Sequence, residues 1–159
     1  MKNKFLILLI ILCLFINIGC TNKKVEENIE TEKSVYLKYV KEIKKIKESS
    51  KDLPFNVDIK YEKMKDEVRY QVIIDNPTTD IINIRALAFH NKQTDDIFPS
   101  IGIFDKKVNL IPNKKPSGVI LVGYFPYEGD IDKLNLKMKV LIEYKMNNEK
   151  HKSYYVTKK

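Results

Sequence analysis

The sequence predicts a mainly β protein: an antiparallel immunoglobulin-like β-sandwich of seven or eight strands, preceded by one amphipathic helix. Three observations support this prediction. From Phe55 onward, apolar residues recur at every second position, which is the period of a strand. Turn signals interrupt this pattern about every 8–12 residues, a spacing typical of β-sandwiches. Before Phe55, residues 34–50 show a helical period, and no second helical pattern follows. We therefore assign the sandwich to residues 55–159.

Three segments, 55–61, 68–74 and 81–90, begin the predicted sandwich. The first two alternate apolar and polar residues, and they are separated by a turn at 65–67. The stretch Asp75–Thr78 (Asp-Asn-Pro-Thr) predicts the next turn, because proline fixes φ and Asp and Asn side chains close the backbone locally. The third segment has apolar residues on both faces, which indicates a central strand. One face contains Ile82, Ile84, Ala86 and Ala88, and the other contains Leu87 and Phe89.

The second half of the sandwich follows the same logic. Two short strands are expected at 101–104 and 108–111, and residues 112–118, which contain two prolines and a glycine, form a long turn. The remaining expected strands are 119–125, then 134–144 with the clearest alternation in the chain, and finally 152–157 after a turn at Asn147-Asn148.

The helix expected over residues 34–50 has an apolar stripe about 140° wide at 100° per residue. Ser34 or Thr31 is suited to cap its start, and Pro54 prevents a long continuation. Three arrangements remain open for the stripe: packing against its own domain, lying on a membrane surface, or self-association. The stripe consists of Val35, Tyr36, Tyr39, Val40, Ile43 and Ile46.

Residues 20–33 are polar, highly charged and without periodicity, so we expect them to form a flexible tether. Residues 1–19 differ sharply. Lys2 and Lys4 precede an uninterrupted apolar run from Phe5 to Ile16, which is too short to span a bilayer comfortably but has the length of a signal-peptide core. We expect residues 1–19 to be a signal peptide.

The end of this segment, Gly19-Cys20, resembles the bacterial lipoprotein signal, in which a small residue precedes a cysteine that becomes the lipidated N-terminus. The resemblance implies lipidation of Cys20 and an anchor on the extracytoplasmic face of the cell membrane. An uncleaved anchor, or secretion without lipidation, is the alternative. Cys13 lies within the signal, so the mature domain has no disulfide and depends on its core.

The segment from Val72 to Tyr144 resembles the small immunoglobulin-like domains of secreted bacterial lipoproteins. The resemblance rests on two turns, Asp75-Asn76-Pro77 and Leu110-Ile111-Pro112, the second followed by Gly118 and the apolar stretch 119–121. These motifs imply the fold. Domains of this kind are mostly uncharacterised or act as binding and accessory modules, and no tryptophan is present to form an antibody-type core.

The charge pattern argues against a nucleic-acid partner. The formal net charge is +8, but Arg69 and Arg85 are the only arginines, whereas nucleic-acid readers use arginine forks for guanine and phosphate. Lysines distributed over a surface favour solubility and some attraction to anionic lipid or wall polymer.

The sequence offers no catalytic motif. His90 and His151 are the only histidines, and neither has the neighbours of a known nucleophile motif. No metal or cofactor motif is present either. The loop acids Glu128, Asp130 and Asp132 and the pair Asp95-Asp96 near His90 are metal candidates that surface-turn chemistry explains equally well. We expect no enzyme activity, no metal and no cofactor.

The least ordinary stretch is 95–107, where apolar residues surround Pro99 and Gly102, both of which are unfavourable inside strands. An apolar loop between charged flanks is a candidate partner-binding site, with Phe98 expected to be the best exposed. A strand at the sheet edge that covers the core is the alternative. The candidate residues are Ile97, Phe98, Ile101 and Phe104.

Together these observations predict a lipid-anchored, non-catalytic binding or accessory module with a protein partner at the cell envelope. An alternative is a lipoprotein that gives immunity to a toxin or inhibits an envelope hydrolase. Both have one small domain and a basic charge, so the sequence does not separate them.

Overall fold

A computed structural model describes residues 22–94 and 97–158 of the 159-residue chain. The expected signal peptide 1–19 and the expected lipidation site Cys20 lie outside the described residues. The chain divides into two compact units, residues 1–34 and 35–159, and helix α2 (Asn22–Lys45) runs across the boundary between them. The sandwich and residues 35–45 of the helix belong to the second unit.

Helix α2 is longer at its start and shorter at its end than the sequence suggested. It begins at Asn22, so the expected tether is wrong for residues 22–33, and it ends at Lys45 rather than near residue 50. The segment 22–45 contains no glycine or proline and is rich in lysine and glutamate, which are good helix formers. High charge had suggested disorder, but backbone propensity favours a helix.

The end of α2 is fixed by a side chain from the sandwich. Lys139 Nζ donates hydrogen bonds to the backbone carbonyls of Ile43 (3.2 Å) and Lys44 (2.8 Å). The last carbonyls of a helix have no partner within the helix, and a cation there also complements the helix dipole. Lys139 therefore acts as a C-terminal cap.

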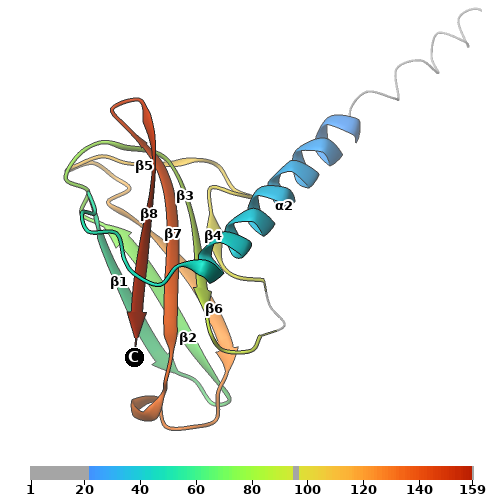
Figure 1. The fold of residues 1–159 in the computed structure, drawn as a ribbon, viewed down its shortest axis with the longest axis vertical. Coiled ribbons are helices and arrows are strands. Elements are labelled where there is room, and N and C mark those ends of the chain that lie inside the picture. Colours follow the sequence, from blue (N-terminus) through green and yellow to red (C-terminus); the bar gives the residue numbers. More distant parts are fainter. Residues whose placement is uncertain (1–21, 95–96, 159) are drawn as a thin grey trace, which may run out of the picture. The chain divides into compact units, whose positions relative to one another are not determined.

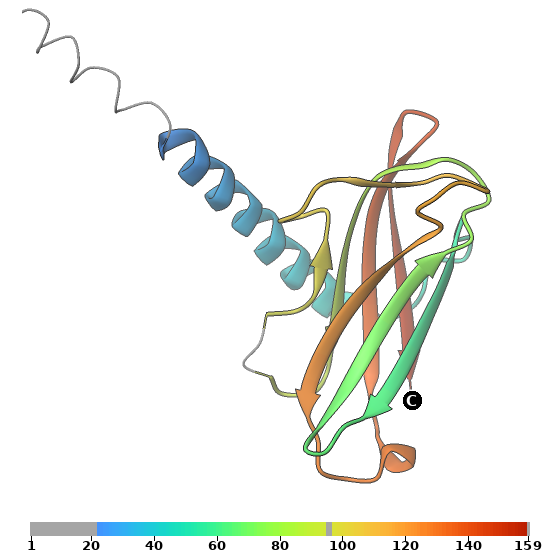
Figure 2. The same cartoon turned by 180° about the vertical axis from the view of Figure 1, so that it is seen from behind.

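In the described part of the chain, eight strands form two antiparallel sheets, as the sequence predicted (Figures 1 and 2). The first sheet has the order β1-β2-β6, and the second has the order β4-β3-β7-β8, with β5 also paired to β3. The chain passes from one sheet to the other three times, between β2 and β3, between β5 and β6, and between β6 and β7, as in immunoglobulin-like sandwiches. The first sheet consists of β1 (Asn56–Lys63), β2 (Glu67–Asp75) and β6 (Gly118–Pro126). The second consists of β3 (Ile81–His90), β4 (Ser100–Ile101), β5 (Val108–Leu110), β7 (Lys137–Met146) and β8 (Glu149–Lys158); a short 3-10 helix, η2 (Ile131–Lys133), precedes β7.

The main core lies between the inner faces of the two sheets. Every second residue of β2 is buried, from Val68 to Ile74, and β6 and β7 contribute matching rows. Gly123 is required within this core, because a Cβ there would lie 2.3 Å from the Tyr70 ring that packs over it. The predicted alternation in these strands is confirmed.

A second apolar cluster lies on the outer face of the β3–β7 sheet. Tyr36, Tyr39 and Ile43 of α2 pack there against Leu87, Ile103 and Leu141. Of the three arrangements considered for the helical stripe, packing against its own domain is confirmed. This also explains why β3 and β7 have apolar residues on both faces: each is covered by the other sheet on one side and by α2 on the other.

A β-bulge changes the predicted faces of β3. Ile82 pairs with Lys145 and Arg85 pairs with Glu143, so β3 advances three residues while β7 advances two. The extra residue brings Ile81, not Ile82, to the buried face with Ile84. Asn83 in the bulge has a positive φ of 55°, a conformation that asparagine tolerates, and its N–H donates to Asn109 Oδ1 at 2.8 Å.

The expected strand at 101–104 is only two residues long, Ser100–Ile101. Gly102 has a φ of +73°, and a Cβ at this position would lie 2.1 Å from the carbonyl oxygen of Ile84. The chain therefore turns out of the sheet at Gly102, directly against β3, and Ile103 goes on to pack beneath α2.

Candidate functional site

The four residues of the predicted partner-binding stretch do not form one exposed surface. Ile97 is 78% exposed and Phe104 is 46% exposed. Phe98 and Ile101 are half-buried, and Ile101 pairs with Ala86 and packs against the main core. The structure thus separates two accessible side chains from two that support the fold.

Phe98, expected to be the best exposed, is held in place from three sides. Its backbone N–H donates a 2.7 Å hydrogen bond to the Tyr36 hydroxyl of α2. Its ring centroid lies 4.5 Å from that of Phe89 and 5.2 Å from that of His90. The expectation rested on Pro99, which interrupts strand pairing, and on the charged flank before Phe98. It was wrong because Tyr36 of the helix and Phe89 on the outer face of β3 both contact this residue.

Ile97 and Phe98 border a hollow between residues 97–99 and strand β6. Its volume is about 330 Å³. Tyr70 and Gly123 lie at the inner side of this hollow, where the missing glycine side chain leaves room for the tyrosine ring. The hollow is lined by Tyr70, His90, Thr94, Ile97, Phe98, Pro99, Val122, Gly123 and Tyr124.

His90 lines the same hollow but is only 2% exposed. Its ring lies 5.0–5.2 Å, centroid to centroid, from the rings of Tyr70, Phe98 and Phe125. Burial lowers the pKa of His90 to about 4, and the backbone of Lys92 partly opposes this shift. His90 is therefore neutral at physiological pH and forms part of an aromatic cluster at the end of β3.

Strand β6 is a long sheet edge. Among the described residues it pairs only with β2, so every second residue directs its backbone N–H and C=O toward the open side. Its nine residues, Gly118–Pro126, include no charged side chain. The other long edges are charged: β1 contains two lysines, an aspartate and a glutamate, and β8 contains three lysines and a glutamate. Strand β4 has only two residues.

The outward side chains of β6 are apolar as well. Ile120 is 53% exposed, Val122 is 38% exposed and Tyr124 is 39% exposed. Figure 2 shows β6 at the margin of the sheet that faces the viewer. Natural proteins protect exposed edges with charges, prolines, bulges or short strands, and β6 has none of these along its middle. We define the edge site as Ile97, Ile120, Val122 and Tyr124 together with the hollow beside them.

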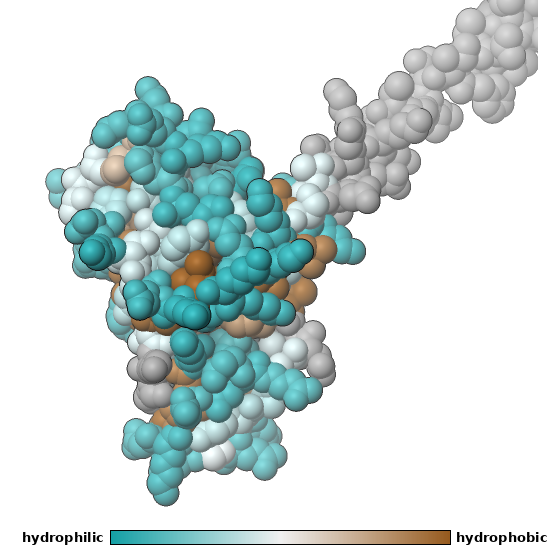
Figure 3. Space-filling model, in the orientation of Figure 1, coloured by the Kyte–Doolittle hydropathy of each residue, from teal (hydrophilic) through white to brown (hydrophobic). Residues whose placement is uncertain are grey.

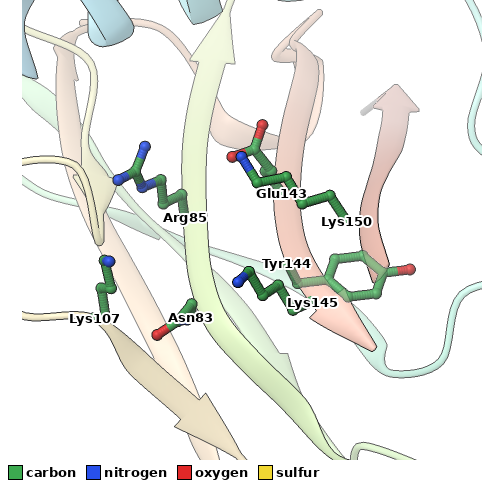
Figure 4. A pocket seen from close by; sticks show the side chains of 7 residues that line it. All are labelled: Asn83, Arg85, Lys107, Glu143, Tyr144, Lys145 and Lys150. Carbon is green, nitrogen blue, oxygen red and sulfur yellow. The ribbon is translucent and has the colours of Figure 1, made fainter. Parts of the chain in front are cut away.

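A second concave site lies on the outer face of the other sheet (Figure 4). Its volume is about 220 Å³. Asn83 and Arg85 come from β3, Lys107 from the segment before β5, and the remaining lining residues from the β7–β8 hairpin. Figure 4 shows Lys150 extending toward Glu143, whereas the Tyr144 ring points away. We call this the basic pocket; it is lined by Asn83, Arg85, Lys107, Glu143, Tyr144, Lys145 and Lys150.

Arg85 and Glu143 also adjoin the helix contact. Burial raises the pKa of the Tyr39 hydroxyl, Glu143 raises it further, and Arg85 opposes the shift. Lys152 Nζ lies 3.0 Å from Glu42 Oε2 and 4.0 Å from Glu143 Oε2. In the view of Figure 1 this side of the molecule has a mainly hydrophilic surface (Figure 3).

The loop acids considered as metal ligands have a local structural role. Asp130 Oδ1 accepts a hydrogen bond from the N–H of Asp132 at 3.0 Å and caps η2, while its carbonyl accepts one from the Tyr127 hydroxyl. Within residues 22–94 and 97–158, no three His, Cys, Asp or Glu side chains are grouped to hold a metal ion. Asp95 and Asp96 lie outside the described residues. No helix in the described part of the chain is both long and apolar enough to cross a membrane.

Both the edge site and the basic pocket contain residues that sequence reasoning did not select. A nine-residue strand without charge was visible in the sequence, but its place at a sheet edge depends on the pairing of β2 with β6. The basic pocket depends on the bulge at Asn83 and on residues far apart in the chain. Neither pattern identifies a site before the topology is known.

Comparison with family models, with curated protein sequences and with solved structures yields no significant match to this chain.

Proposed function

We propose that this protein is a lipid-anchored, non-catalytic binding module on the extracytoplasmic face of the cell membrane, and that it captures an extended segment of a protein partner along strand β6. The observation that carries the proposal is the contrast between the edges: β6 alone among the long edge strands of the described chain lacks charges. Edges that are not protected against pairing accept an added strand, and this is a recurring mode of peptide recognition.

The edge site supplies both parts of such recognition. The free backbone groups of β6 bind the main chain of the added strand, which gives affinity without sequence preference. The hollow of about 330 Å³ between Ile97 and Val122 is lined mainly by apolar and aromatic groups, so it accepts one apolar side chain of the partner. Burial of such a side chain contributes roughly 1.5–3 kcal/mol, about a ten- to hundredfold change in affinity.

The membrane part of the proposal rests on the resemblance of Gly19-Cys20 to the lipoprotein signal. A Cys20→Ala chain is expected to lose membrane partitioning, because each buried CH₂ of an attached lipid contributes about 0.8 kcal/mol. Cell fractionation followed by high-salt and carbonate washes measures this. Retention of the variant in the washed membrane pellet would show that Cys20 is not the anchor.

Site-specific photocrosslinking in the host envelope tests the binding surface. A photoreactive residue at Tyr124 on β6 is expected to crosslink to one partner, and the same residue at Asn56 on β1 is not. Val122→Lys adds a charge to the open edge and should abolish the crosslink from Tyr124. Asn56→Lys is the matched control, because it adds one charge to the opposite edge of the same sheet, facing Asp75.

Two results would contradict the edge proposal. One is equal crosslinking from β1 and β6, and the other is a partner whose crosslink survives Val122→Lys. A further readout is hydrogen exchange, since strand addition should protect alternate amides of β6 and leave those of β1 unchanged.

A further inference from the structure

The β7–β8 hairpin places two lysines directly opposite each other at the basic pocket. Asn147 and Asn148 both have positive φ values, 52° and 64°, which form the two-residue turn that matches the twist of a hairpin. This turn fixes the register so that Lys145 pairs with Lys150. Like charges directly opposite each other on one face of an antiparallel pair are destabilising.

Two more cations converge on the same place. The bulge at Asn83 shifts β3 by one residue relative to β7, so that Arg85 faces the pocket. Lys107 reaches it from the segment before β5. Arg85 and Lys145 are half-buried, whereas Lys107 and Lys150 are exposed at the rim. The pocket thus collects four basic side chains from three separate stretches of chain.

Their charge is poorly neutralised. Among the described residues, Glu143 is the only acidic one that lines the pocket, and its carboxylate also lies 4.0 Å from Lys152. Within the part of the chain that the structure describes, none of Arg85, Lys107, Lys145 and Lys150 forms an ion pair within 4.0 Å. Four cations, two of them half-buried, with a single carboxylate among them favour an anion that bridges them.

We propose that the basic pocket binds the phosphate group of a phosphate-bearing ligand. The volume of about 220 Å³ lies below the roughly 300 Å³ at which pockets for whole small molecules begin, so it suits one phosphate and the atoms next to it. Arg85 offers a planar fork of donors and the lysines offer point charges, both of which match phosphate oxygens. A phosphate monoester carries about −1.5 to −2 charges at pH 7, more than a carboxylate, which suits an excess of three positive charges.

Isothermal titration calorimetry on the full chain in neutral detergent tests the site, with inorganic phosphate and glycerol phosphate as probes. Both are expected to bind saturably, and acetate at the same ionic strength is not. The double variant Lys145→Gln/Lys150→Gln should weaken binding at least about tenfold. The control double variant Lys60→Gln/Lys133→Gln removes the same charge from exposed positions outside the pocket and should change affinity less than about twofold.

Thermal unfolding provides a second measurement that does not depend on calorimetric heat. Phosphate should raise the melting temperature of the unaltered protein and of the control variant, but not that of Lys145→Gln/Lys150→Gln. Without phosphate, the pocket variant should melt no lower than the unaltered protein, because a like-charge pair has been removed. Equal loss of binding in the two double variants, or equal binding of acetate, would overturn the proposal.

An experiment with lipid bilayers distinguishes a lipid phosphate from a soluble one. Protein in phosphatidylcholine nanodiscs with and without phosphatidylglycerol is examined by NMR of the Asn83 and Lys145 amides. Larger shifts with phosphatidylglycerol than with soluble glycerol phosphate at the same concentration assign a lipid headgroup; equal or larger shifts with soluble glycerol phosphate assign a diffusible or polymeric phosphate. Shifts with neither overturn the proposal. This outcome is independent of strand addition at β6, which lies on the other sheet.

Discussion

The Tyr154 hydroxyl of β8 donates a 2.6 Å hydrogen bond to Glu42 Oε1 of α2. Lys152 Nζ reaches the other carboxylate oxygen at 3.0 Å, so one glutamate receives two donors from neighbouring positions on β8. Burial alone would raise the pKa of Glu42, but these bonds outweigh it and the pKa is lowered. The last strand of the sandwich thereby holds the helix by charge-assisted contacts as well as by apolar packing.

Tyr154→Phe is expected to lower the free energy of unfolding by about 1–2 kcal/mol, because a hydrogen bond to a charged and partly buried group is lost. Urea unfolding measures this. A double-mutant cycle with Glu42→Gln isolates the pair and should give a coupling energy of at least about 0.5 kcal/mol. Additive effects of the two substitutions would show that the contact does not stabilise the docked helix.

The same pair predicts a dependence on pH. The pKa of Glu42 is lowered in the folded state, so its contribution is present above the ordinary glutamate pKa and is lost as pH falls through the folded value. The stability difference between the unaltered protein and Tyr154→Phe should therefore shrink between about pH 5 and pH 3. A difference that stays constant over this range would contradict the assignment of the shift to Glu42.

Two residues of α2 provide a matched test of helix docking. Ile43 is fully buried against Leu87 and Leu141, so Ile43→Ala should cost about 2–5 kcal/mol. Leu37 is 54% exposed on the same helix, and Leu37→Ala should change stability by no more than about 0.5 kcal/mol. Urea unfolding of both variants measures the contrast. Equal effects would indicate that the helix is not part of the cooperative unit.

The strands were predictable because burial of one face imposes a period of two on the sequence. Strands β2 and β6 keep that period over nine residues each, and their boundaries agree with the prediction to within one residue. The helical stripe was also predictable, because burial of one face of a helix imposes a period of about 3.6 residues. Which of three surfaces it would cover was not visible, because the apolar face of β3 that receives it is the same kind of surface that a second sheet would cover.

The sequence misled where one residue changed the register or where backbone propensity outweighed polarity. Ile82 and Ile84 are two residues apart and were predicted to lie on the same face, but the bulge at Asn83 places Ile82 on the opposite face of β3. The charged stretch 22–33 was expected to be a tether and is helical. The candidate site was partly wrong for a third reason: the exposure of Phe98 depends on Tyr36 and Phe89, and nothing local to residue 98 reveals those contacts.

Phe98 and Ile97 are neighbours with opposite expected behaviour. Phe98 packs between Phe89 and His90, so Phe98→Asp buries a charge without a partner and should lower the melting temperature by roughly 10 °C or more. Ile97 is 78% exposed, and Ile97→Asp should shift the melting temperature by roughly 2 °C or less. Scanning calorimetry of the two variants decides the matter. A stable Phe98→Asp protein would place that ring outside the core.

The buried imidazole of His90 predicts that stability falls in mild acid. Burial lowers its pKa to about 4 from the ordinary 6.5, so the unfolded chain takes up a proton at a higher pH than the folded protein does. The difference in proton uptake at His90 has no effect on stability above about pH 6.5. As the pH falls toward 4, it lowers the free energy of unfolding, by about 3 kcal/mol at most.

His90→Phe tests this prediction, because it keeps an aromatic ring among Tyr70, Phe98 and Phe125 and removes the titration. Between pH 7 and pH 4.5 the variant should lose about 2–3 kcal/mol less unfolding free energy than the unaltered protein, measured by urea unfolding at each pH. His151→Gln removes the other imidazole and should retain the full fall, since His90 is still present. If His90→Phe and the unaltered protein lose stability in parallel, the imidazole is not held neutral in the folded state, and the aromatic cluster does not exclude its charge.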